Sequence, residues 1–336
     1  MDTPPPAGNG AHNGKRGRAR AMVKVSPYMV IPSRVGGFSL YLKQGDRLVL
    51  YAEKGELFTE EHKQRLGLLG VDHLYVRTED YALFTRYLQD NILEILDDES
   101  IPVGERARVW SDATTSLARE AFDRSLPAPV DKRRFQRIHK LITDSLRFLS
   151  REDALKELAR FIREGEELFQ HGVGVMVLTV TTLCSFMKED SDLIVAVGMG
   201  ALLHDIGKLE LPPEIFAKKF ETLSRADKDL VKSHPALGVG VCSALPLPQE
   251  TLQCILFHHE REDGLGYPSG STGAMLPSYV RALALCNEYD NLTRGRTERR
   301  LTPFEALVRI KSMRSAFDMD MLRRLIEVLA KADLTS

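Results

Sequence analysis

Residues 193–208 read LIVAVGMGALLHDIGK, an apolar run that ends in His204 and Asp205, with Lys208 shortly after. The run is about half as long as a bilayer-spanning helix, so it predicts a buried core helix that leads into His204. An aspartate can bridge two cations while a histidine binds one, and Lys208, four positions after His204, could neutralise a phosphate oxygen. A lone His-Asp pair is more often a salt-bridged surface turn, so this string alone does not establish a site.

A second string, HHEREDGLGYP at residues 258–268, follows a short apolar run. Burying two adjacent imidazoles costs free energy of desolvation unless both are hydrogen-bonded or bound to a metal. Gly264 and Gly266 permit a tight loop in which Tyr267 and the backbone can approach a ligand closely. This string therefore also indicates a ligand site.

Five of the nine histidines form a set that lies entirely after residue 139. They are His171, expected to end a helix, His234, expected to begin one, and His204, His258 and His259. A single such histidine is more often a packing residue, but several interleaved with acidic residues indicate a metal site. Nitrogen and oxygen ligands without thiolates suit Fe, Mn, Mg or Zn, and the number of histidines favours Fe, Mn or Zn. Two such cations can support in-line displacement at phosphorus, which makes phosphodiester hydrolysis the predicted reaction class.

The composition is that of a soluble globular protein, with 43% apolar and 28% charged residues. A net charge of −1 argues against a dedicated nucleic-acid binder. The four cysteines are scattered and form no C-x-x-C pair, as in a reduced cytoplasmic protein. We expect no membrane span, because no stretch is long and apolar enough.

The chain divides into four expected regions. Residues 1–24 predict a disordered basic tail, residues 25–97 a small α+β domain with a regulatory or docking role, and residues 98–130 a helical connector. Residues 131–336 predict an all-helical phosphohydrolase domain. Within the small domain we expect a hairpin over 38–51, a helix opened by Thr59, a strand over 73–76 and a helix over 82–96. The later helices are expected over residues 134–149, 152–169, 175–187, 193–204, 249–258, 277–292, 303–313 and 319–330.

The two strings resemble the HD-GYP family, a branch of the HD metal-dependent phosphohydrolases. Its namesake motifs correspond to His204-Asp205 and Gly266-Tyr267-Pro268, and the likeness extends from about residue 164 to residue 330. The resemblance implies an HD-type helical bundle with two or three divalent metal ions, usually Fe or Mn. It also implies hydrolysis of cyclic di-GMP, a bacterial second messenger, to pGpG and in some members to GMP.

The resemblance also assigns roles to individual residues. By position, the implied metal ligands are Glu167, His171, His204, Asp205, His234, His258, His259 and Asn287. Lys208, Gly266, Tyr267 and Arg296 correspond to substrate contacts, and Asp205 with Lys208 carries the catalytic role. The implied partner is cyclic di-GMP or a related cyclic dinucleotide; signalling proteins and a second copy of the chain are further candidate partners.

Three departures from the family pattern affect these assignments. Asn287 stands where the family has a metal-binding aspartate, so one metal should be held more weakly, unless Asp290 or Glu288 supplies a carboxylate. Glu262 replaces an aromatic residue, and Arg296-Thr297-Glu298 replaces an R-P-Y string at the substrate rim.

Two functions therefore stay open, with a third less favoured. The first is an active cyclic di-GMP phosphodiesterase, supported by Lys208 and the complete histidine set. The second is a degenerate member that binds a cyclic dinucleotide or a partner protein without efficient turnover, supported by Asn287 and the altered rim. An HD phosphohydrolase of another nucleotide is less favoured, because the Gly266-Tyr267-Pro268 loop argues against it.

Overall fold

Four short antiparallel strands and one helix are the main elements of the first compact unit of this computed structural model. The structure describes residues 21–34, 36–124, 131–162, 168–187, 190–218, 220–295 and 299–335. The chain divides into two units, residues 1–84 and 85–336. The mainly helical architecture with a small preceding α+β part confirms the predicted fold class.

The sheet of the first unit has the strand order β1-β4-β2-β3. Its elements are β1 (Met22–Val25), β2 (Leu40–Gln44), β3 (Arg47–Ala52), α1 (Glu60–Leu68) and β4 (Leu74–Arg77). The predicted hairpin is confirmed, because β2 pairs with β3 across a turn in which Gly45 takes a positive φ of 57°. Thr59 caps α1 as expected, accepting a hydrogen bond from the backbone of His62. Strand β1 begins within residues 1–24, which were expected to form a disordered tail, because these residues pair with β4.

Three helices follow the last strand along the chain, and the division between the two units falls within the first of them. They are α2 (Tyr81–Asp90), α3 (Ile92–Asp97) and α4 (Val103–Ala121). The indole of Trp110 on α4 is fully buried and donates a 2.8 Å hydrogen bond to Ser145 Oγ on α5 (Lys132–Leu149). Within the stretch expected to be a connector, α4 therefore packs as part of the helical unit, and the division between units falls after Phe84.

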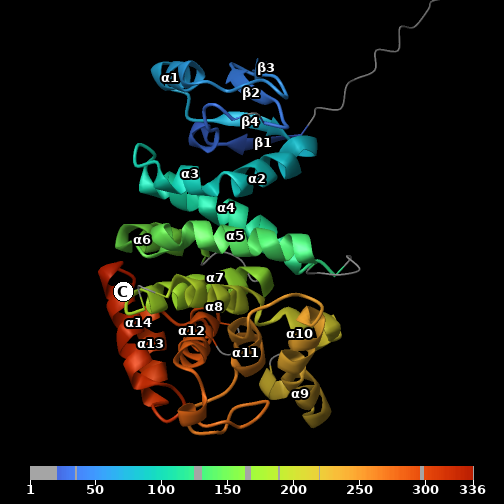
Figure 1. The fold of residues 1–336 in the computed structure, drawn as a ribbon, viewed down its shortest axis with the longest axis vertical. Helices are drawn as coiled ribbons and strands as arrows, with labels where there is room; N and C mark the ends of the chain where they lie inside the picture. Colours follow the sequence, from blue (N-terminus) through green and yellow to red (C-terminus); the bar gives the residue numbers. More distant parts are fainter. Residues whose placement is uncertain are drawn as a thin grey trace, which may run out of the picture. The chain divides into compact units, whose positions relative to one another are not determined.

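Two apolar helices occupy the centre of the helical unit, α7 (Leu168–Cys184) and α8 (Ser191–Leu203). Both are buried nearly all round, as expected for helices without a polar face. Figure 1 shows α5 and α6 (Glu152–Ile162) on one side of this pair and α11 (Gln249–Phe257) and α12 (Ser278–Arg294) on the other. The remaining α-helices of the unit are α9 (Arg225–Lys232), α10 (His234–Cys242), α13 (Pro303–Ser312) and α14 (Met319–Lys331).

The expected helix boundaries need one correction that concerns the site. His171 was expected to end a helix, but it lies in the first turn of α7. Gly172 and Gly174, which follow it within the helix, allow close packing. A Cβ at Gly172 would lie 2.4 Å from the carbonyl oxygen of Leu202 on α8. Among the described residues, no helix combines the length and apolarity needed to cross a membrane.

Candidate metal centre

The end of α8 places His204 and Asp205 at the centre of the helical unit. Both are buried, and the chain continues from them into a short 3-10 helix, η3 (Ile206–Glu210), which carries Lys208. Lys208 Nζ lies 2.6 Å from Asp205 Oδ2. Gly207 is required at this turn, because a Cβ there would lie 2.0 Å from the carbonyl oxygen of His234. The string at residues 204–208 therefore folds against the start of α10.

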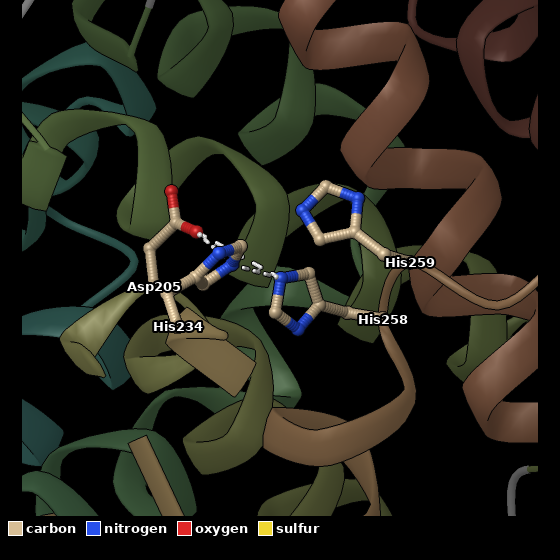
Figure 2. Close-up of side chains that lie close together, drawn as sticks. All are labelled: Asp205, His234, His258 and His259. Atoms are coloured by element: carbon tan, nitrogen blue, oxygen red, sulfur yellow. Dashed lines mark hydrogen bonds and ion pairs between the residues drawn. The ribbon is translucent and has the colours of Figure 1, made fainter. Parts of the chain in front are cut away.

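Three histidines from other elements lie around Asp205 (Figure 2). His234 begins α10, as expected, and His258 and His259 follow the end of α11. His234 Nε2 lies 3.3 Å and His258 Nε2 3.8 Å from Asp205 Oδ1. These four side chains bring one ligand atom each within 4.8 Å of one another, a spacing that suits one metal ion.

The other oxygen of Asp205 belongs to a second group of ligand atoms. His204 Nε2 lies 3.6 Å and His171 Nε2 3.8 Å from Asp205 Oδ2. His171 reaches this point from α7, which packs directly against α8. The two groups share only Asp205, so a carboxylate stands between two potential cation sites, each with its own histidines.

The tautomers of these histidines suit metal binding. Nδ1 of His204, His234 and His258 lies 2.6–2.8 Å from the carbonyl oxygen three residues earlier. A carbonyl only accepts, so each Nδ1 carries the proton and, in the neutral ring, Nε2 presents a lone pair. His234 Nε2 and His258 Nε2 then face each other at 3.0 Å without a proton between them. A cation between such nitrogens relieves their repulsion, and the donor set therefore fits divalent metal ions.

Burial keeps these ligands in the form that binds cations. Burial is the main cause that lowers the pKa of His204 to about 3 and those of His258 and His259 well below their ordinary value. Burial alone would raise the pKa of Asp205, but Lys208 and the neighbouring imidazoles outweigh it and hold that pKa well below its usual range. The rings of His204, His258 and His259 are therefore neutral and the Asp205 carboxylate is ionised at neutral pH.

Helix α12 contributes Asp290, a residue whose role the sequence did not reveal. Its Oδ2 lies 2.7 Å from His171 Nδ1 and 2.6 Å from Nε of Arg294, with all three side chains buried. Such a carboxylate orients a ligating imidazole from behind. Both contacts involve Oδ2, so we interpret Asp290 as the residue that orients His171, and a direct role as a metal-binding carboxylate stays a prediction.

Asn287 lies one turn before Asp290 on the same face of α12 and is only 3% exposed. Its Oδ1 accepts a 3.2 Å hydrogen bond from Asn291 Nδ2. It lines the same cavity as His258 and His259. Asn287 therefore brings an uncharged oxygen close to the candidate centre.

The loop over residues 258–268 folds back on itself beside the ligands. Gly266 is essential to this fold, because a Cβ there would lie 2.5 Å from the carbonyl oxygen of His259. The ring of Tyr267 stacks on the ring of His259, with centroids 4.5 Å apart. Buried Glu260 accepts hydrogen bonds from three successive backbone N–H groups, of Ser269, Gly270 and Ser271. That role could not be predicted from the sequence, since only the fold brings those amides to Glu260.

A cavity of about 650 Å³ opens above the ligands. Seven of the residues predicted to act on substrate or metal line this one space: Lys208, His234, His258, His259, Gly266, Tyr267 and Asn287. Two predicted residues, Glu167 and Arg296, lie outside the described residues.

A family model described as "HD domain" matches residues 137–321, more than half of the chain and all of the described ligands. The chain belongs to the HD domain family. The matched range of this HD domain protein extends from α5 into α14.

Curated relatives of the HD domain protein include a cyclic di-GMP phosphodiesterase, PA4108, from Pseudomonas aeruginosa. It is 29% identical over 54% of this chain and 44% of its own length. The cyclic di-GMP phosphodiesterase response regulator RpfG of Xanthomonas campestris is 33% identical over 30% of this chain and 27% of its own. A 3'3'-cGAMP-specific phosphodiesterase of Vibrio cholerae is 30% identical over 36% of this chain and 28% of its own. The chain spans less than half of the length of these relatives.

A solved structure, Bd1817 from Bdellovibrio bacteriovorus, described as an HDG"Y"P protein, has the same fold. The TM-score is 0.64 at 22% identity, and the match covers 92% of this chain and 100% of that one. The predicted resemblance to HD-GYP proteins is confirmed.

Proposed function

We propose that this HD domain protein is a metal-dependent phosphodiesterase that hydrolyses cyclic di-GMP to pGpG. The observation that carries the proposal is the position of Asp205, whose two oxygens each belong to a separate group of histidine nitrogens. Two cations held in this way are suited to displacement at phosphorus. The curated relatives named as cyclic di-GMP phosphodiesterases support the choice of substrate.

We assign one metal to His234, His258, His259 and Asp205, and the other to His171, His204 and Asp205. Asn287 is the neutral candidate ligand beside them, and Fe or Mn is the expected metal. When bound, such ions activate water near neutral pH and act as Lewis acids toward a phosphoryl oxygen.

The chain's own residues bind and orient the substrate. The Lys208 ammonium lies in the cavity wall next to Asp205, where it can attract the anionic phosphodiester and stabilise charge that develops on it. Burial raises the pKa of Tyr267, so its hydroxyl stays protonated and can donate a hydrogen bond to substrate. The Glu260 carboxylate holds the backbone of residues 269–271 in place beside Tyr267.

One specific observation favours a second candidate, a protein that binds a cyclic dinucleotide without efficient turnover. Asn287 brings no negative charge to the centre, and the buried Arg294 guanidinium lies 2.6 Å from Asp290 Oδ2. A neutral amide and a nearby positive charge both weaken the attraction for cations. A protein with one filled metal site could still bind nucleotide in the cavity.

A single set of measurements distinguishes the two functions. Purified protein is analysed for metal content and incubated with cyclic di-GMP in the presence of Mn²⁺ or, anaerobically, Fe²⁺, and products are separated by chromatography. We expect about two metals per chain and formation of pGpG. Metal-loaded protein that forms no product with either metal would contradict the first function, and nucleotide binding under those conditions would favour the second. Parallel reactions with 3'3'-cGAMP show which cyclic dinucleotide is preferred.

A further inference from the structure

Two phenylalanines are exposed on the wall of the cavity above the metal ligands. Phe216 lies in the 3-10 helix η4 (Pro213–Ala217) and Phe220 begins η5 (Phe220–Thr222). Each side chain is 37% exposed, although both line the cavity that contains His258 and His259. Exposing large aromatic rings to water is unfavourable, so a pair of them beside a ligand cavity indicates a surface that a ligand covers.

Positive charges lie next to both rings. Lys208 Nζ is 6.0 Å from the ring centre of Phe216, and Lys228 Nζ is 5.8 Å from that of Phe220. The same Lys208 ammonium lies 2.6 Å from Asp205 Oδ2. One ammonium group therefore separates the Phe216 ring from the candidate metal centre, so a phosphate beside Lys208 would hold its attached nucleoside near Phe216.

The aromatic ring closest to the ligands is already engaged. Tyr267 stacks on His259 and also has Lys232 Nζ 5.8 Å from its centre. Its ring is therefore held as part of the loop that borders the metal ligands. Phe216 and Phe220 are the cavity aromatics whose rings are most open to a ligand among the described residues.

We propose that Phe216 and Phe220 form a stacking platform for a purine base of the substrate. The proposal rests on the proposed function, because it assumes that the cavity receives a nucleotide. A base has an apolar π-face that stacks on phenylalanine, and the neighbouring lysines complement the charge of the phosphodiester. The platform recognises a base by its face, so it contributes affinity for purine nucleotides without choosing between guanine and adenine.

Steady-state kinetics with cyclic di-GMP test the platform in the full chain. Phe216→Ala should raise KM roughly tenfold, the typical loss of one base–aromatic stack, while kcat changes little. Phe216→Tyr should have a KM close to that of wild type, because tyrosine keeps the aromatic ring that stacks on the base. Phe304→Ala is the matched control, since Phe304 is 63% exposed and lies outside the cavity. An unchanged KM in Phe216→Ala, or an equal rise in Phe304→Ala, would overturn the platform and leave the proposed activity standing.

Fluorescence tests the same contact without any turnover. The chain has a single tryptophan, Trp110, which is fully buried, so Phe216→Trp introduces the only exposed indole. We expect GMP and cyclic di-GMP to quench this indole, whereas ribose 5-phosphate, which lacks a base, should not. Quenching in a protein that hydrolyses nothing would support the platform while contradicting the proposed activity. No quenching by either nucleotide, or equal quenching by ribose 5-phosphate, would overturn the platform.

Discussion

His234 Nε2 faces His258 Nε2 at 3.0 Å, and the proton of each ring is used on the opposite side, at Nδ1. The two nitrogens are held as acceptors with no donor between them. Only a cation satisfies both at once, which makes this pair the most direct physical sign of a metal site.

Asp205→Asn should remove the one ligand that both groups share. An amide has a single neutral oxygen to offer, so we expect metal content to fall from about two ions per chain to less than one, and hydrolysis to fall at least 100-fold. Metal analysis after gel filtration and a product assay measure both. Asp192→Asn, in the exposed first turn of α8, is the control. Retention of two metals in Asp205→Asn would show that Asp205 is not shared.

Asn287→Asp should strengthen metal binding at the candidate centre. The substitution places a carboxylate on the buried face of α12 one turn from Asp290, so we expect at least a tenfold gain in Mn²⁺ affinity for the weaker site. The metal-free variant should be less stable, because a buried charge without a cation is costly. Calorimetric Mn²⁺ titration and urea unfolding provide the two readouts. If neither affinity nor occupancy rises, Asn287 does not limit metal binding.

Asp290→Asn should weaken one metal site selectively. The carboxylate orients His171 through Nδ1, and loss of such a partner typically reduces metal affinity 10- to 100-fold. The group of His234, His258 and His259 does not contact Asp290, so we expect one Mn²⁺ site to weaken and the other to persist. Titration of the variant beside wild type resolves the two sites. Equal weakening of both would contradict this assignment of Asp290.

The metal-free protein should lose stability as the pH falls below about 6.5. Burial lowers the pKa of His204 to about 3, so between these values the unfolded chain binds a proton that the folded chain does not. Each histidine of this kind contributes a slope of about 1.4 kcal/mol per pH unit. Urea unfolding at pH 7.5, 6.0 and 5.0 measures the slope, which His204→Gln should reduce. His139→Gln, at an exposed position, should leave it unchanged.

Gly266→Ala should impair catalysis while leaving the metal ligands intact. Its Cβ would lie 2.5 Å from backbone atoms of both His259 and Glu260, so the loop that carries Tyr267 must shift. We expect kcat/KM to fall at least tenfold with metal content near that of wild type. Gly240→Ala on α10 is the control, because a Cβ there meets no atom within 4 Å. Unchanged kinetics in Gly266→Ala would mean that the loop adapts without loss.

The sequence predicted those parts of the site whose ligands are neighbours along the chain. His204-Asp205 and His258-His259 are adjacent pairs of ligand-type residues, so a shared metal site could be expected before any fold was known. The predicted helices over 134–149, 193–204 and 277–292 correspond to α5, α8 and α12, because each has a clear apolar pattern. Elements defined by distant partners were missed, as with the four-residue strand β1, which forms only because β4 pairs with it.

The roles of Glu260 and Asp290 were also beyond the sequence. An acidic residue reads as a surface charge or a ligand, and nothing local distinguishes either from an acceptor for backbone amides or for His171. The helical position of His171 was misjudged for a related reason. Glycines after it indicate a helix end by local propensity, whereas the structure uses them for contact between α7 and its neighbours.

The hydrogen bond that orients each imidazole affects how this centre can change during evolution. His204, His234 and His258 are fixed by the main chain of their own turns, so most substitutions around them leave their direction unaltered. His171 instead depends on a side chain from another helix, and a single codon change at Asp290 can misdirect it. We therefore expect random substitution during evolution to remove the metal site of His171 first. The result would be a protein with one metal ion, intermediate between an enzyme and a nucleotide receptor.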